Sequence, residues 1–406
     1  MNLQAQYVGL SEEEQALQKM VRDFAESKAR PLSKTHEDAG TDPADVYTEL
    51  GQLGLTGLPF DPEFGGGGQP YGTYLMVIEE IARAWVGLAI GLGVHTLCCD
   101  GIERFGSTDL KKELLPQMLA GQKFGAYALS EPSSGSDAAA LQSKAVKFDD
   151  EYRISGQKQF CTRGAEADYV LVMARTGEAG PRGISAFIVE KGTEGFQPSK
   201  AENKMGWRSS PTWGLVFNEC PVPAERLLAE EGEGFKIALA ALGAGRLGIA
   251  ACSIGLAQAA LEAAVKFASE REQFNQRIVD FQGIQFMLAD MATQIEAGRA
   301  LYRHAAALKD AGMPYSREAS MAKLFCSDTA MRVTIDAIQV HGGYGYVEEY
   351  PVERYMREAK GLQIVEGTNQ IQRMIIGRTL GSDSGGSQLL ARTGDNSGPL
   401  LPPRPP

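Results

Sequence analysis

The 406-residue sequence has few of the residues that build metal sites and disulfide frameworks. Its six cysteines are scattered and include no CxxC pair, a spacing that fits neither a disulfide scaffold nor a zinc site. The four histidines are isolated, with no HExxH pattern and no pair spaced four residues apart. We therefore expect reduced thiols and no metal ion.

Positive charge is also in short supply. The chain has 40 lysines and arginines against 51 acidic residues, which gives a net charge of −11 and a pI near 5.1. Proteins that bind nucleic acid usually present a basic face that neutralises phosphates, and no basic cluster of that kind occurs here. Nucleic acid is not an expected partner.

Membrane and export signals are missing from the sequence as well. No uninterrupted apolar run approaches the length of roughly 18 to 20 residues that spans a bilayer, so membrane insertion is not expected. The start of the chain carries the acidic cluster Ser11–Glu14 rather than the basic, apolar pattern of a secretory signal. It also differs from the Arg-rich, acid-poor composition of a mitochondrial transit peptide. These features predict a cytoplasmic protein.

The N-terminal part, residues 1–122, has the 3.6-residue periodicity of helices. Ser11 and Glu14 form a capping box at the first of them, and Pro31 is expected to end or kink that helical region. A second helix is expected after Asp42-Pro43. The four glycines at 65–68 lack the GK[ST] sequence of a phosphate-binding loop, so they are interpreted as a flexible connection.

The pattern then changes twice. Residues 123–225 contain short alternating segments bounded by glycine-bearing turns, which predict a compact antiparallel β domain. Residues 226–380 return to helical periodicity and predict a bundle of long helices. Residues 381–406 are rich in Gly, Ser and Pro and are expected to be a disordered tail, with a polyproline ligand as the alternative.

Residues 243–248 match the GxGxxG fingerprint of dinucleotide-binding folds, and Glu262 lies at the spacing of a ribose-binding acid. The fingerprint requires a preceding buried strand, but residues 235–242 have a helical composition. No alternating β–α–β pattern flanks it either. We therefore reject a nicotinamide-dependent enzyme on a Rossmann fold, which would require a parallel sheet around residues 230–265 and would be ruled out by helix throughout that stretch.

Four segments carry more specific information when they are taken together. They are Tyr127–Asp137 (YALSEPSSGSD), Gly156–Gly164 (GQKQFCTRG), Arg271–Phe274 with Phe281-Gln282, and Gln339–Tyr346 with Ile364–Arg373. In this order, on a chain that is helical, then β, then helical, they resemble the acyl-CoA dehydrogenase family. The likeness covers about residues 8–380 and is closest to the short-chain, butyryl-CoA type. It implies an α+β fold with an N-terminal helical domain, a middle antiparallel β-barrel-like domain and a C-terminal four-helix bundle.

The resemblance implies FAD-dependent oxidation of an acyl-CoA to the 2-enoyl-CoA, with Glu366 as the base and the flavin as hydride acceptor. Removing the α-proton of a thioester requires a carboxylate shielded from water, and Ile364 and Val365 supply an apolar approach to Glu366. Burial would raise its pKa to a useful value. Glu366 could instead simply open the helix predicted over residues 367–378. Some family members carry the base just before the arginine that matches Arg246, but that position here is Gly245.

For the flavin, the resemblance implies contacts from the loop 127–136 to the ring and pyrophosphate, and from residues 160 and 162 to the other side of the ring. Phe160 stands where family members commonly carry tryptophan. The second helical part supplies positions for the adenosine half, some of them across a subunit interface. The implied FAD-binding residues are Tyr127, Leu129, Ser130, Ser136, Phe160, Thr162, Arg271, Phe274, Phe281, Gln282, Gln339, Gly342, Gly343, Thr368 and Gln370.

The substrate positions implied by the resemblance are Ser136, Arg246 and Gly367. Gly243 replaces an aspartate that usually helps to position the CoA portion, which leaves acyl length and branching open. The expected partners are an acyl-CoA, an electron-transferring flavoprotein and further copies of the chain in a homotetramer. The alternatives are an acyl-CoA oxidase, a desulfinase or nitroalkane oxidase on the same scaffold, or a flavin- or acyl-CoA-binding protein without turnover.

Overall fold

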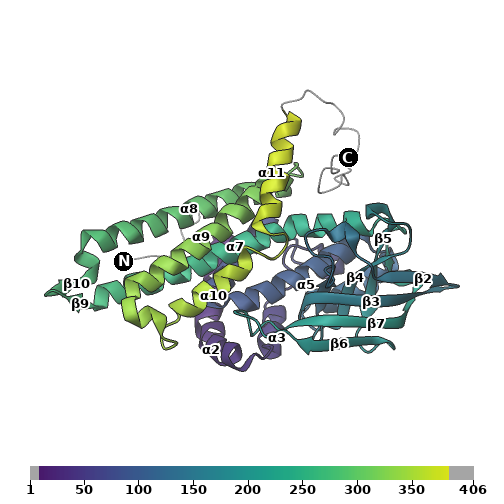
Figure 1. Ribbon diagram of the computed structural model, residues 1–406, viewed down its shortest axis with the longest axis horizontal. Helices are drawn as coiled ribbons and strands as arrows, with labels where there is room; N and C mark the ends of the chain where they lie inside the picture. The colour runs from purple at the N-terminus through teal and green to yellow at the C-terminus, as the bar shows by residue number, and fades with distance from the viewer. Residues whose placement is uncertain (1–8, 384–406) are drawn as a thin grey trace.

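The computed structural model describes residues 9–383 and has three parts in chain order: helices, a β sheet and a second set of helices (Figure 1). This order and the α+β fold class were predicted from the sequence and are confirmed. The predicted tail lies outside the described residues, apart from Gly381–Asp383, which form the end of the last helix. The N-terminal helices are α1 (Glu12–Phe24), α2 (Arg30–Ala39), α3 (Ala44–Gln52), α4 (Tyr71–Ala84), α5 (Val86–Phe105) and α6 (Thr108–Leu119).

The predicted capping box begins α1: the Glu14 amide donates to Ser11 Oγ, and the Ser11 amide donates to the Glu14 carboxylate. Pro31 does not end this helical region, which was one of the two outcomes expected of it. A π-helical turn, Ala25–Ala29, precedes it, and the chain continues directly into α2 with Pro31 in the first turn. A proline is tolerated there because the first amides of a helix have no partner within it.

The glycines at 65–68 form a tightly packed turn rather than a flexible connection. Their four amides donate to carbonyl oxygens of residues 57–62, so none of these amides is available to a phosphate. A Cβ on Gly66 would lie 2.2 Å from the Phe60 carbonyl oxygen. The turn therefore needs glycine for close backbone approach, and the interpretation against a phosphate loop agrees with the structure.

The sheet has eight strands, in the order β6-β7-β3-β2-β4-β5-β8, with β1 paired to β4. Most pairs are antiparallel, as the sequence predicted, but β1 pairs with β4 in parallel and β2 meets β4 in parallel at one position. The strands are β1 (Gly125–Ala128), β2 (Lys144–Phe148), β3 (Glu151–Thr162), β4 (Tyr169–Arg175), β5 (Ile184–Glu190), β6 (Phe196–Ala201), β7 (Thr212–Pro223) and β8 (Leu227–Leu228).

Strand β4 is buried on both faces because each face packs against a different core. Val170 and Val172 lie in a core within the β domain. Leu171 and Met173 point the other way and pack in a core with residues of α5 and α6. Apolar side chains on both faces remove the alternation expected of a strand with one face in water. The sheet is thus fixed against the first helical domain.

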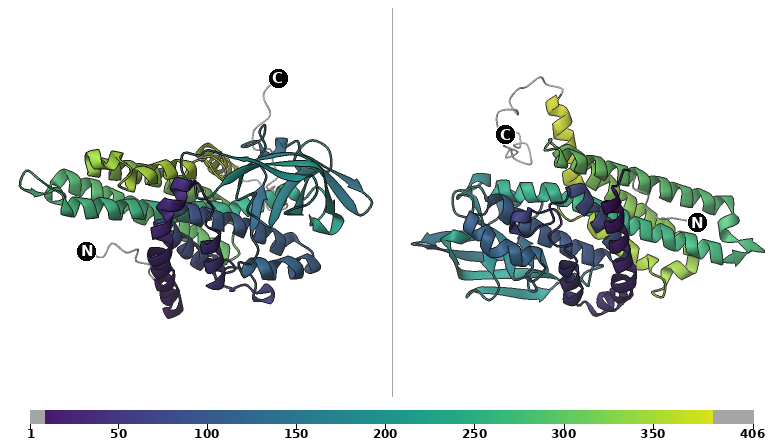
Figure 2. Two further views of the ribbon diagram at one scale, coloured as in Figure 1. Left: turned by 90° about the horizontal axis from the view of Figure 1, so that it is seen from below. Right: turned by 180° about the vertical axis from the view of Figure 1, so that it is seen from behind.

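The C-terminal helices are α7 (Gly234–Glu270), α8 (Gln282–Asp310), α9 (Ser316–His341), α10 (Val352–Leu362) and α11 (Asn369–Asp383). A short hairpin, β9 (Glu272–Gln273) and β10 (Gln276–Arg277), joins α7 to α8. The GxGxxG sequence lies within α7, and residues 234–270 are helical throughout. A Rossmann βαβ unit is therefore ruled out there. Figure 2 shows the sheet and the β9–β10 hairpin at opposite ends of the elongated molecule.

Two helices correct the expectation about apolar runs. Val86–Phe105 and Gly234–Glu270 are long and apolar enough to cross a membrane by length and composition. Their apolar windows are 78% and 72% buried inside the protein, as in the core helices of a globular domain. Burial against other helices accounts for their composition. All six cysteines are buried and have free thiols, and among residues 9–383 no cluster of three His, Cys, Asp or Glu residues could hold a metal ion.

Candidate active site

Glu366 lies in the turn between α10 and α11, and its backbone has a left-handed conformation with φ of +53°. Gly367 follows with φ of +90°. A left-handed glutamate is uncommon and requires support from its surroundings. That support comes from hydrogen bonds: the Asn369 amide donates to the Gln363 carbonyl at 3.0 Å, and Gln372 Nε2 donates to the Gly367 carbonyl at 2.8 Å. The turn directs the Glu366 side chain away from α11, against α7.

The Glu366 carboxylate packs directly on α7 at Gly245. A Cβ placed on Gly245 would lie 2.0 Å from Glu366 Oε2 and 3.0 Å from Oε1. Oε2 is buried and has no hydrogen-bond partner among residues 9–383. Burial raises the pKa of Glu366 to about 7, although Lys323 and Arg246 partly oppose the rise. A carboxyl group with a free oxygen and a pKa near neutrality is suited to accept a proton.

A small and narrow, mostly apolar cavity opens in front of this carboxylate. Two tyrosines of α4 limit it. Tyr71 donates its hydroxyl to the Ala244 carbonyl at 3.0 Å, and Tyr74 donates to Thr96 Oγ1 at 2.9 Å, so both rings are held in place. Helices α4, α5 and α7 supply the walls, through Tyr71, Tyr74, Ile78, Ala89, Ile90, Gly93, Leu97, Gly245, Gly248, Ile249 and Cys252.

Arg246 is the cation beside this cavity. It is only 6% exposed, and its Nε is buried without a hydrogen-bond partner among residues 9–383. Burial lowers its pKa, while the charge of Glu366 and the phenol of Tyr315 act in the opposite direction. An unsatisfied donor on a buried charge is costly unless a ligand supplies the acceptor. Arg246 therefore has the properties of a ligand-binding group.

Tyr315 lies near the usual aspartate position, Gly243. Its hydroxyl oxygen is 3.5 Å from the point that a Cβ on Gly243 would occupy. It also interacts electrostatically with Arg246, one helical turn further along α7. The hydroxyl thus fills space that a longer side chain at 243 would need, and it places a polar group there.

The sheet contributes a further group near Glu366 through Tyr127 of β1, which the loop 129–137 follows. Tyr127 has a buried hydroxyl without a hydrogen-bond partner in the described chain, and its pKa is raised by burial and by the charge of Glu366. The loop is held to β3 by the Gln159 amide, which donates to the Ser130 carbonyl at 2.8 Å. A buried ion pair also holds it, because Lys158 Nζ lies 2.8 Å from Glu131 Oε1 and 3.2 Å from the Leu129 carbonyl.

Next to this loop, Phe160 projects from β3 with φ of +59° and is 67% exposed. A large aromatic side chain in a left-handed backbone that faces solvent is unusual for a core residue and is typical of a binding surface. Thr162 lies two residues on and is half-buried, and Ser136 is exposed on the loop. The half-buried Thr368 and the exposed Gln370 are close to Glu366 in the chain, on either side of the start of α11.

The remaining predicted FAD positions gather at the other end of α7. The guanidinium of Arg271 lies over the Tyr344 ring, and the Phe274 and Phe281 rings meet edge to face. A groove there is lined by Arg271, Gly342 and Gly343, and Gln282 and Gln339 are exposed close by in the chain. Arg271 follows Gly245 by 26 residues, or about 39 Å of α-helix. One chain therefore holds two separate groups of predicted cofactor positions.

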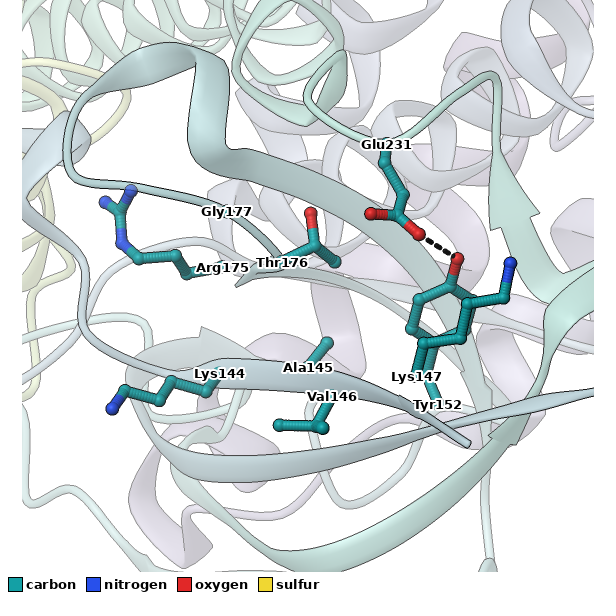
Figure 3. A pocket seen from close by; sticks show the side chains of 9 residues that line it. All are labelled: Lys144, Ala145, Val146, Lys147, Tyr152, Arg175, Thr176, Gly177 and Glu231. Atoms are coloured by element: carbon teal, nitrogen blue, oxygen red, sulfur yellow. Dashed lines mark hydrogen bonds between the residues drawn. The ribbon is translucent and has the colours of Figure 1, made fainter. Parts of the chain in front are cut away.

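Another hollow lies on the β domain and contains none of these positions. Figure 3 shows Lys144, Lys147 and Arg175 around it, with the Tyr152 hydroxyl donating to Glu231 at 2.6 Å. Some of the nitrogen atoms around this hollow already have hydrogen-bond partners, since Arg175 donates to the carbonyls of Leu141 and Gly180. We do not assign it to the active site.

The sequence matches three family profiles over most of its length. They describe the N-terminal, middle and C-terminal domains of acyl-CoA dehydrogenases and match residues 11–122, 126–220 and 232–381. The chain belongs to the acyl-CoA dehydrogenase family.

Relatives of this acyl-CoA dehydrogenase are similar over nearly their whole length. An acyl-CoA dehydrogenase of Bacillus subtilis is 45% identical, over 91% of this chain and 98% of that one. An isobutyryl-CoA dehydrogenase of Dictyostelium discoideum is 42% identical, over 93% and 91%. The butyryl-CoA dehydrogenase structure of Megasphaera elsdenii has a TM-score of 0.90 at 44% identity, over 92% and 100%.

A chain from a structure of the electron-transferring flavoprotein of Acidaminococcus fermentans is also similar. It has a TM-score of 0.91 at 46% identity, and the match covers 92% of this chain and 99% of that one. These relatives support the short-chain type and make the protein an oxidoreductase with FAD as its cofactor.

The residues of this acyl-CoA dehydrogenase fit a flavin at the sheet side of the cavity. The unpartnered hydroxyl of Tyr127 and the outward face of Phe160 suit a flat ring system with polar edges. Reasoning from the sequence missed Tyr71, Tyr74, Tyr315 and Lys323. The tyrosines looked like ordinary core residues of amphipathic helices, and a buried lysine has no periodic signature that distinguishes it from an exposed one.

Proposed function

We propose that this enzyme oxidises a short linear or branched acyl-CoA to the 2-enoyl-CoA, with Glu366 as the base that removes the α-proton. The observation that carries the proposal is the buried, unpartnered Oε2 of Glu366 against Gly245, at the head of an apolar cavity. A group inside that cavity can reach this oxygen and transfer a proton to it. Apolar walls exclude the water that would otherwise compete for it.

The cavity supports a short acyl group. Tyr71 and Tyr74 are fixed by hydrogen bonds and cannot swing aside without breaking them, so they limit its depth. Relatives named for isobutyryl-CoA and for short-chain acyl-CoA support both branched and linear substrates of that size. We propose that Arg246 and the Gly367 backbone hold the thioester end, and that Ser136 lies on the loop side of it.

FAD, when bound, supplies the two-electron acceptor for the β-hydrogen. The groups that this chain contributes are the backbone and hydroxyls of Leu129, Ser130 and Ser136, the Tyr127 hydroxyl, and the faces of Phe160 and Thr162. Thr368 and Gln370 complete this half of the site at the start of α11. Electrons then pass, we propose, to an electron-transferring flavoprotein, which the similarity to the A. fermentans structure supports.

The second group of FAD positions supports an assembly of several copies. About 39 Å of helix between Gly245 and Arg271 exceeds the reach of one extended FAD molecule. We propose that Arg271, Phe274, Phe281, Gln282, Gln339, Gly342 and Gly343 hold the adenosine half of FAD bound mainly to a neighbouring copy. The family resemblance implies that four copies assemble.

The test is the visible absorption spectrum of the purified protein, recorded without oxygen before and after addition of butyryl-CoA or isobutyryl-CoA. We expect a bound flavin that loses its absorbance on addition of substrate. Glu366→Gln, which has nearly the same shape but cannot accept a proton, should bind flavin and keep it oxidised. If either thioester reduces the flavin of the variant as well as it reduces that of wild type, Glu366 is not the base.

A further inference from the structure

Lys323 on α9 is a fully buried lysine, with no exposed surface. Its Nζ donates to the Gly367 carbonyl at 3.0 Å and to Asn369 Oδ1 at 2.9 Å. Both acceptors are neutral. Burying an ammonium group without a bonded anion is costly, so a structural role alone could be filled more cheaply by a neutral donor.

The two acceptors belong to the turn that carries Glu366. Gly367 follows Glu366 directly, and Asn369 begins α11. Asn369 is itself fixed, since its Nδ2 donates to Asp328 Oδ1 at 2.7 Å. Lys323 therefore ties both sides of the left-handed turn to α9, and the position of the Glu366 carboxylate depends on that connection.

The ammonium also acts on the carboxylate through its charge. The charged or titratable groups that interact with Glu366 are Lys323 from α9, Arg246 and Cys252 from α7, Tyr71 and Tyr74 from α4, and Tyr127 from β1. Only Lys323 and Arg246 carry positive charge, and Lys323 opposes the burial effect on the Glu366 pKa more strongly. Burial lowers the pKa of Lys323 to about 7, against the attraction of Glu366 and Asp328.

We propose that Lys323 is a positioning residue for the base: its ammonium holds the Glu366–Asn369 turn and keeps Glu366 in the carboxylate form. The inference rests on the proposed function of Glu366. In the reaction, the substrate Cα–H bond breaks and a Glu366 O–H bond forms. A nearby positive charge stabilises the Glu366 carboxylate before the proton is transferred. It therefore lowers the pH at which the base becomes ionised.

The test measures the rate of flavin reduction by butyryl-CoA without oxygen between pH 5.5 and 9, in wild type, Lys323→Gln and Lys323→Met. Gln can still donate to Gly367, whereas Met cannot, and neither has a charge. We expect both variants to move the midpoint of the pH profile upward by about one unit or more, so that the rate at pH 6 falls roughly tenfold. A slower rate with an unmoved midpoint in both variants would reduce Lys323 to a structural residue.

Lys323→Arg is the matched control because a guanidinium keeps its charge over this whole range. Its midpoint should stay at or below that of wild type, and a rise would overturn the proposal even if the neutral variants do not accumulate as folded protein. Failure of the proposed function looks different. In that case wild-type flavin is not reduced by the thioester, or Glu366→Gln remains active.

Discussion

The carboxylate of Glu366 occupies the space above Gly245 in which any other residue would place its Cβ. That Cβ would lie 2.0 Å from Glu366 Oε2 and 2.7 Å from Cδ, well inside van der Waals contact. Some family members carry the base at the position of Gly245, but a side chain there is incompatible with the observed position of Glu366. The two positions therefore compete for one space, and in this chain the carboxylate on the turn fills it.

Replacing Gly245 with alanine should displace the carboxylate. A displacement of about 1 Å at a reacting group can reduce the rate about 10²-fold, and we expect a loss of that order in flavin reduction, with flavin still bound. Stopped-flow absorbance measures it. Gly377→Ala on α11 is the control, because nothing lies within 4 Å of its Cβ. Equal rates in the two variants would show that the Glu366 side chain can move aside without loss.

The pH profile of flavin reduction should follow the ionisation of Glu366. Burial raises its pKa to about 7, and only the ionised form can accept the α-proton. The rate at subsaturating substrate should therefore rise about tenfold per pH unit below pH 7 and level off above it. A profile that is flat between pH 5.5 and 8 would contradict a base with this pKa.

Tyr315→Phe should weaken substrate binding more than catalysis. The lost hydroxyl lies beside Gly243, where the family resemblance implies an aspartate that positions CoA, and it interacts electrostatically with Arg246. Loss of one hydrogen bond of about 1 to 1.5 kcal/mol predicts a KM roughly 5- to 12-fold higher with little change in kcat. Steady-state kinetics with butyryl-CoA would measure both values. A fall in kcat at constant KM would show that Tyr315 acts in the chemical step rather than in substrate binding.

Mixing two inactive variants tests the shared flavin site. Glu366→Gln removes the base from one group of residues, and Arg271→Ala weakens the other group, about 39 Å away in the same chain. If neighbouring copies complete each site, a mixed assembly contains some sites with both residues intact. Co-expressed chains should then regain activity that neither variant has alone. No recovery in purified mixed assemblies would mean that each copy builds its site alone.

Glu358 should make the stability of the fold depend on pH, independently of catalysis. It is buried on α10, and burial together with Glu37 raises its pKa to about 8. A carboxyl group whose folded-state pKa exceeds its unfolded value of about 4.5 stabilises the fold at low pH, and this contribution is lost as the pH rises through about 8.

Glu358→Gln stays neutral at every pH, so it should be close to wild type at pH 5. At pH 9 the variant should unfold at a higher temperature than wild type, because its free energy of unfolding is larger by at least about 1 kcal/mol. Thermal unfolding followed by circular dichroism at both pH values would test this. If the difference in unfolding temperature between the variant and wild type does not grow from pH 5 to pH 9, the pKa of Glu358 is not raised.

The sequence by itself determined the order of the three parts, the capping box at Ser11 and Glu14, and the absence of a Rossmann unit in residues 234–270. These follow from local periodicity, capping and composition, which act over a few residues. It also determined the family, since four short motifs occur in a fixed order. The polar groups in those motifs, such as Ser130 and Arg271, were therefore predicted without knowledge of any contact.

Only the tertiary structure decided how those groups are distributed. It placed Glu366 against Gly245, 121 positions earlier in the sequence, and separated Arg271 from both along α7. It also brought Lys323 to Gly367, closed the cavity with Tyr71 and Tyr74, and paired β1 with β4 in parallel. Burial, pKa shifts and close packing depend on residues distant in sequence, so no local pattern along the chain encodes them.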